Sequence, residues 1–97
     1  MNKALLARVE EYVLGLFRQT GETRLLARQI FDASPGYANA DIVRAFEDLG
    51  KRQRALVRYT EEGDDWVSLT PEGARLAGLP APDEPPPAHP HPPKGAA

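Results

Sequence analysis

The sequence predicts a mostly helical α+β fold made of a three-helix bundle, a two-stranded β-hairpin and a short C-terminal helix. Apolar residues recur at the helical spacing through the first fifty residues, and β-branched and aromatic residues dominate from Leu56 onward. Eight of the ten prolines lie in the last eighteen residues, where no large apolar residue occurs. We therefore predict one folded domain over residues 1–79 and a disordered, proline-rich tail over residues 80–97.

Residues 3–19 have the pattern of an amphipathic helix. Seven apolar side chains fall within an arc of about 140° at the helical turn per residue, which predicts one broad buried face: Leu5, Leu6, Val9, Tyr12, Val13, Leu16 and Phe17. Gly21 fits the end of this helix. Leu14 falls outside the arc, so we expect it to be exposed. A lone exposed leucine is common, and a contact between two copies of the chain is the alternative.

A second, shorter helix is predicted to begin with Thr23 as its N-cap and to end at Asp32. Arg24 and Arg28, four residues apart, share the side of this helix opposite its apolar residues. The Pro35-Gly36 dipeptide that follows predicts a turn. The second and third helices are therefore expected to be joined by a connection of about seven residues.

The third helix is expected to have Asn39 as its N-cap. It ends at Gly50 or continues to about Arg54. The longer helix would place Gln53 on the core face, which favours the earlier end. The apolar residues on one side of this helix predict its buried face: Ile42, Phe46 and Leu49.

The segments 56–60 and 66–70 are predicted strands of a β-hairpin, joined by the polar residues 61–65. Thr70 is then a suitable N-cap for a last short helix, with Pro71 at its first position. Three aromatic residues are assigned to the core: Phe46, Tyr59 and Trp66.

The composition excludes several classes of protein. The chain has no cysteine, and hence no disulfide framework, thiolate metal site or cysteine nucleophile. No apolar run approaches the ~18–20 residues of a membrane span, and the charged N-terminal segment is not a secretory signal, so we expect a cytoplasmic protein without a membrane partner. Residues 1–79 hold eleven basic and twelve acidic residues. A net charge of −1 does not by itself indicate a nucleic-acid partner.

Three segments carry a resemblance to a known family. Residues 40–49 resemble the recognition helix of winged-helix regulators, and residues 56–59 resemble the strand that follows it. Residues 67–77, with their Leu-Thr-Pro-Glu-Gly run, are similar to the segment that ends the wing in MarR-like and PadR-like transcriptional regulators. The resemblance covers about residues 4–79 and implies a winged-helix fold. One departure is Ala55, where the family usually has glycine.

The resemblance implies a DNA-binding transcriptional regulator. The helix over residues 39–50 would enter the major groove of double-stranded DNA, with the wing near the backbone. A dimer is expected, because operators often have two-fold symmetry. Eight residues are the candidate contacts: Arg24 and Arg28 from the second helix, Asn39, Arg44 and Lys51 from the third, and Arg52, Arg54 and Arg58 to the backbone.

Alternative explanations of these residues stay open. The arginines could form a solvated face, since cations near the end of a helix are favoured by its dipole alone. Acidic residues count against a phosphate partner, because they lie on the exposed side of the third helix and in the predicted hairpin loop: Asp41, Glu47, Asp48, Glu61, Glu62, Asp64 and Asp65. The alternative function is a winged-helix module that binds a protein instead of DNA, with Pro85–Pro87 in an aromatic groove of the partner.

An enzyme is not expected, and neither is a cofactor. The two histidines, His89 and His91, lie in the tail, and no histidine of the predicted domain could activate Ser34 or Ser68. No glycine-rich phosphate loop occurs. Two histidines in a tail do not make a metal site.

Overall fold

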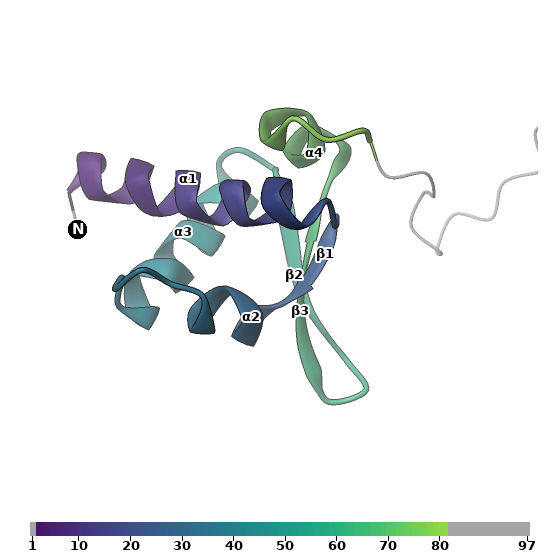
Figure 1. Ribbon diagram of the computed structural model, residues 1–97, viewed down its shortest axis with the longest axis horizontal. Helices are drawn as coiled ribbons and strands as arrows, with labels where there is room; N and C mark the ends of the chain where they lie inside the picture. The colour runs from purple at the N-terminus through teal and green to yellow at the C-terminus, as the bar shows by residue number, and fades with distance from the viewer. Residues whose placement is uncertain (1, 82–97) are drawn as a thin grey trace, which may run out of the picture.

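The structure, a computed structural model, describes residues 2–81, so the predicted tail lies from residue 82 onward outside the described residues. The fold is α+β and mostly helical, with one antiparallel sheet of strand order β1-β3-β2. Helices α1, α2 and α3 lie on one side of the sheet, and the β2–β3 hairpin extends beyond them (Figure 1). The elements in chain order are α1 (Lys3–Thr20), β1 (Arg24–Leu26), α2 (Ala27–Asp32), α3 (Asn39–Lys51), β2 (Leu56–Glu61), β3 (Asp64–Leu69) and α4 (Pro71–Ala77).

The segment after Thr23 is first a strand and then a helix, which corrects the predicted helix over residues 23–32. Strand β1 pairs antiparallel with β3, with Leu25 opposite Val67, so the sheet has three strands instead of two. Helix α2 starts only at Ala27, where the Gln29 side chain accepts a hydrogen bond from the Leu26 N–H at 2.8 Å. Pairing with β3 buries Leu25, and this tertiary contact outweighs the local helical pattern.

Helix α1 agrees with its predicted length, but Leu14 does not agree with its predicted exposure. Val9, Val13 and Phe17 are completely buried, and Leu14 is only 8% exposed. Helix α4 packs against α1, where the Arg18 Nε donates to the Ala77 carbonyl at 2.9 Å. The expectation of an exposed Leu14 was wrong, because Leu14 belongs to the buried core cluster although it falls outside the predicted apolar arc. Leu14 therefore offers no contact to a second copy.

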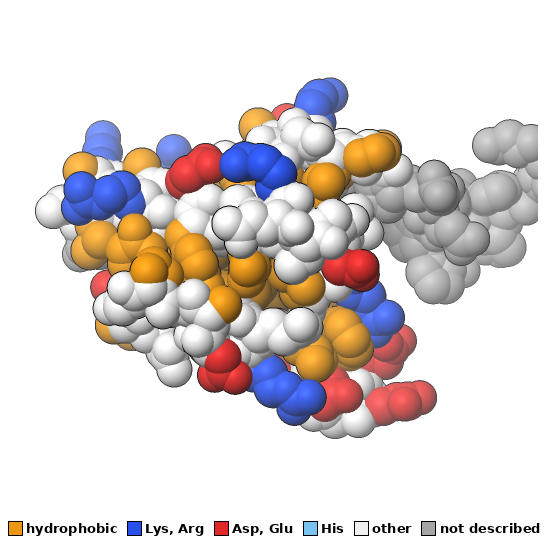
Figure 2. Space-filling model, viewed as in Figure 1, with side chains coloured by type: hydrophobic (Ala, Val, Ile, Leu, Met, Phe, Trp, Pro, Cys, Tyr) orange, Lys and Arg blue, Asp and Glu red, His pale blue; other side chains and the backbone are white. Residues whose placement is uncertain are grey.

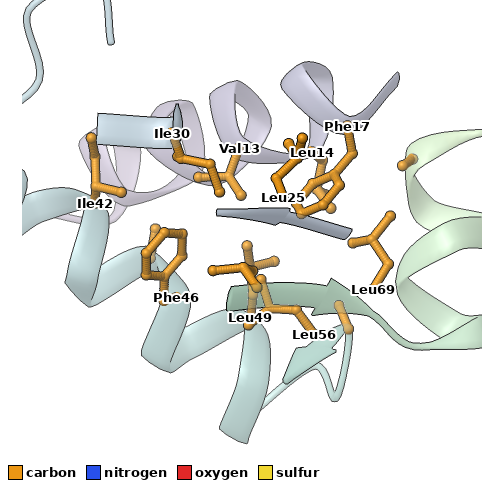
Figure 3. Close-up of a cluster of buried hydrophobic side chains, with 14 of the residues drawn as sticks. Val13, Leu14, Phe17, Leu25, Ile30, Ile42, Phe46, Leu49, Leu56 and Leu69 are labelled. Carbon is orange, nitrogen blue, oxygen red and sulfur yellow. The ribbon is translucent and has the colours of Figure 1, made fainter. Parts of the chain in front are cut away.

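Helix α3 ends at Lys51, one residue beyond the predicted stop. Its N-cap is Ala38, without a side-chain hydrogen bond, so the N-cap role predicted for Asn39 is wrong and Asn39 is the first helical residue. Figure 3 shows the inward side chains of α3 directed toward those of α1 and α2. These inward residues are buried: Ile42, Ala45, Phe46 and Leu49.

The hairpin turn is shorter than the predicted five-residue connection. Strand β2 continues to Glu61 and β3 begins at Asp64, so only Glu62 and Gly63 connect them. Both turn residues have positive φ, 53° and 83°, as a tight two-residue hairpin turn requires. Three of the four acidic residues assigned to the loop, Glu61, Asp64 and Asp65, are therefore strand residues. Strand alternation directs each of their side chains to one face of the sheet.

The junction between β3 and α4 explains the Leu-Thr-Pro-Glu-Gly run. The Thr70 hydroxyl accepts from the Gly73 N–H at 3.0 Å and donates to the Arg54 carbonyl at 2.7 Å. A Cβ at Gly73 would lie 1.8 Å from the carbonyl oxygen of Ala55. Glycine is therefore required at this position by the close approach of α4 to the turn before β2.

Candidate nucleic-acid interface

The outward face of α3 carries two cations. Arg44 and Lys51, seven residues and thus about two turns apart, are both exposed. Neither forms an ion pair with another of the residues 2–81. Asn39 is exposed at the start of the same helix, and Glu47 is exposed between the two cations. The face therefore offers two unpaired positive charges and one negative charge to a partner.

Three further predicted contacts lie at the start of α2 and just after the end of α3. Arg28 is exposed in the first turn of α2, and Arg54 is exposed in the turn after α3, where its φ is 52°. Arg52 is also exposed, but its Nη1 lies 3.3 Å from Asp48 Oδ1. Within the described chain Arg28 and Arg54 have no carboxylate partner, whereas part of the charge of Arg52 is neutralised.

Arg58 lies on β2 at the junction of the hairpin and α3. Its Nε and Nη2 donate to the two carboxylate oxygens of Asp65 on β3, at 3.1 and 2.7 Å. The Arg58 Cζ lies 5.3 Å from the ring centroid of Phe46 on α3. The hydrogen bonds from Arg58 lower the pKa of Asp65 and raise the pKa of Arg58. The pair is therefore ionised and fully salt-bridged at neutral pH.

Arg24 lies on the opposite face of the sheet, on β1 and not on a helix as predicted. Its Cζ lies 3.7 Å from the Trp66 ring centroid and 5.8 Å from that of Tyr59, and it forms an ion pair with Glu61. Trp66 and Tyr59, opposite each other in the β2–β3 register, are half-buried. Their assignment to the core was wrong, because strand alternation directs them to the sheet face that α1–α3 do not cover.

The basic and acidic residues of the domain are not segregated as the sequence pattern suggested. Two of the acidic residues assigned to the hairpin loop, Glu61 and Asp65, are paired with Arg24 and Arg58. Glu62 and Asp64 form no ion pair within residues 2–81, so the hairpin keeps a net charge of −2 even when Arg24 is counted with it. The unpaired cations among the predicted contacts lie on or beside the helices: Arg28, Arg44, Lys51 and Arg54.

A cluster between α1 and α3 was missed by sequence reasoning. Gln53 Nε2 donates to Glu10 Oε1 at 3.2 Å and to Asp48 Oδ2 at 3.4 Å, and Glu10 Oε2 is buried without a hydrogen-bond partner. Burial, together with the nearby Asp48, raises the pKa of Glu10 to about 7. The neighbouring Glu10 carboxyl group lowers the pKa of Asp48. The only sequence signal was that a longer third helix would place Gln53 on the core face. The docking of α1 on α3 brings Glu10 and Asp48 together, and no local spacing indicates it.

Other kinds of site are not apparent in residues 2–81. No three potential metal-ligating side chains of this range come together, and none of its helices has the length and apolarity to cross a membrane. Comparisons with protein-family models, curated proteins and solved structures give no match to the chain. The surface around α3, with its exposed cations, is therefore the candidate site of the described residues.

Proposed function

We propose that this chain is a winged-helix protein that binds double-stranded DNA and acts as a cytoplasmic transcriptional regulator. Helix α3 enters the major groove, and the β2–β3 hairpin is the wing beside it. One observation carries the proposal: α3 is anchored in the core by one face and presents the unpaired cations Arg44 and Lys51 on the other. An anchored helix with exposed cations can approach phosphate without reorganising the fold.

The topology supports the winged-helix assignment. The order of elements is helix, short strand, two helices, hairpin and helix, and β1 pairs with the second hairpin strand. The hairpin follows α3 directly and projects beyond the helices (Figure 1). A duplex that contacts α3 would therefore also lie close to the hairpin.

The four unpaired cations are the proposed phosphate contacts. Arg28, Arg44, Lys51 and Arg54 contact phosphates, because each is exposed and forms no ion pair within residues 2–81. Each neutralised phosphate releases condensed counterions, so the affinity falls as salt is added. The exposed Glu47 weakens non-specific attraction to phosphate. We expect moderate affinity from one domain and a stronger, dimeric complex on a two-fold symmetric site.

The test is a titration of a fluorescent mixed-sequence duplex at several salt concentrations. We expect the slope of log K against log salt to shrink by about one in Arg44→Ala and in Arg28→Ala. Arg8→Ala is the matched control, because Arg8 is an exposed arginine on α1 and is not one of the proposed contacts. Absence of binding by the parent protein at low salt would overturn the proposal.

One observation favours a second candidate, a protein-interaction module. An open groove of about 570 Å³ runs between α1 and the segment before α3, with Tyr12, Leu16, Pro35 and Tyr37 in its lining. Figure 2 shows apolar side chains gathered along this side of the molecule. If this groove binds a protein, Leu16→Glu should abolish the interaction and Arg44→Ala should leave it unchanged, which pull-down with each variant measures.

A further inference from the structure

We propose that Arg58 and Asp65 act together as a neutral base-reading unit, in which Asp65 positions Arg58 to donate to the acceptor edge of a guanine. This inference rests on the proposed DNA-binding function. It assigns Arg58 to base recognition, whereas the sequence suggested a backbone contact. Asp65 is a positioning residue, because it acts on DNA through Arg58.

The donor geometry supports this assignment. Asp65 occupies the side of the guanidinium formed by Nε and one N–H of Nη2. An arginine has five N–H donors in a planar fork, so the end of the fork, with one N–H from each Nη, stays available. Two parallel donors match the O6 and N7 acceptors that guanine presents in the major groove. The paired arginine thus retains the donors required for bidentate recognition.

Packing holds this end of the guanidinium in place. The Phe46 ring, which lies under Arg58, is itself buried on α3, and it contacts the Phe31 ring at a centroid distance of 5.9 Å. The Arg58 side chain nevertheless remains 36% exposed. An arginine fixed by stacking and by a bidentate carboxylate loses little rotamer freedom when it meets a base. Besides Asp65, the Glu47 carboxylate on the outward face of α3 is close enough to raise the pKa of Arg58, so the Arg58 guanidinium is at the edge of the face that would meet DNA.

The net charge of the Arg58–Asp65 pair distinguishes it from the proposed phosphate contacts. The Arg58–Asp65 pair has no net charge, and the Asp65 carboxylate repels a phosphate that approaches it. The guanine edge is an uncharged acceptor and does not suffer this repulsion. Arg44, by contrast, has no carboxylate partner within the described residues. We therefore expect Arg58 to contribute base preference and Arg44 to contribute salt-dependent affinity.

The experiment begins with randomised duplexes selected by the parent protein, followed by replacement of each guanine of the selected site with adenine. Asp65→Asn should reduce the preference for one guanine about tenfold and steepen the salt slope by up to about one, because Arg58 loses its ion-pair partner and keeps only the weaker attraction of Glu47. Glu61→Gln is the matched control. It frees Arg24 on the sheet face that α1–α3 do not cover, so the guanine preference should stay unchanged.

Each outcome distinguishes the two proposals. If neither the parent protein nor Asp65→Asn binds DNA at low salt, DNA binding and base reading are both overturned. If the parent binds DNA and Asp65→Asn keeps both its guanine preference and its salt slope, only the base-reading unit is overturned. Arg58→Lys decides the matter if Asp65→Asn does not fold. Lysine keeps the charge without the planar fork, so an unchanged guanine preference in this variant also refutes the unit.

Discussion

The two faces of α3 differ in burial and therefore in what they contribute to the stability of the fold. On the inward face Ile42, Ala45 and Leu49 are completely buried against the other helices and the sheet (Figure 3). On the outward face Arg44, Glu47 and Lys51 are exposed. Burial of apolar area supplies the stability of the helix, whereas exposed polar side chains contribute little to it. The outward face can therefore vary with function without a large loss of stability.

Two pairs of residues at the margins of α3 extend this comparison. Asp48 meets another carboxyl group, Glu10, in a half-buried position, and one proton relieves their repulsion. At the other margin Asp65 meets Arg58 at the surface, and both groups are ionised. The same carboxylate chemistry thus makes the packing of α3 on α1 sensitive to pH but leaves its contact with the hairpin insensitive near neutrality.

The largest effect is expected on the inward face. Phe46→Ala removes a ring that contacts Phe31 and supports Arg58, so the free energy of unfolding should fall by about 3–5 kcal/mol. Urea denaturation followed by circular dichroism measures it. A loss below about 1 kcal/mol would contradict the inward face as the anchor of α3.

An intermediate effect is expected at the α1–α3 margin. Between pH 4.5 and about 7 the folded domain retains a proton on Glu10 that the unfolded chain has released. The free energy of unfolding should therefore fall as the pH rises through this window, by at most about 3 kcal/mol in total and by less in proportion to the solvent screening of the partly exposed group.

Glu10→Gln keeps a neutral side chain of the same size and removes this titration. Its stability should be nearly constant over the same window, which urea denaturation at pH 5, 6, 7 and 8 measures for both proteins. Equal pH dependence in the parent and in Glu10→Gln would refute the shared proton.

The smallest effect on stability is expected on the outward face. Arg44→Ala removes an exposed side chain without an ion pair in the described part of the chain, so the free energy of unfolding should change by less than about 0.5 kcal/mol. Thermal and urea denaturation of this variant beside Phe46→Ala checks the contrast. A loss comparable to that of Phe46→Ala would show that the two faces are not energetically separate.

The elements that the sequence predicted well are those with a strong local pattern. The seven apolar positions of residues 3–19 predicted α1, and the Thr70-Pro71 pair predicted the start of α4. The hairpin strands were also predicted, although their five-residue connection was wrong. Alternation continues through the acidic residues of this connection, but polar composition hides the strand signal there.

The sequence could not reveal features that require a partner distant in the chain. Strand β1 exists because β3 pairs with it, and Leu14 is buried because it joins a core cluster that includes residues of α3, β2 and β3. The candidate contacts stay predictions as DNA ligands, but their surroundings differ from expectation. Arg24 and Arg58 are stacked on aromatic rings and paired with acidic residues, which no local spacing indicates.

The sequence by itself determined the main helices and the start of α4, because periodicity and capping act over a few neighbouring residues. Only the tertiary structure decided which charges meet. It places Asp65 on Arg58 and Glu61 on Arg24, and leaves Arg44 and Lys51 without a described carboxylate partner. Charge pairing depends on distances of a few ångströms between segments far apart in the chain, and only folding sets those distances.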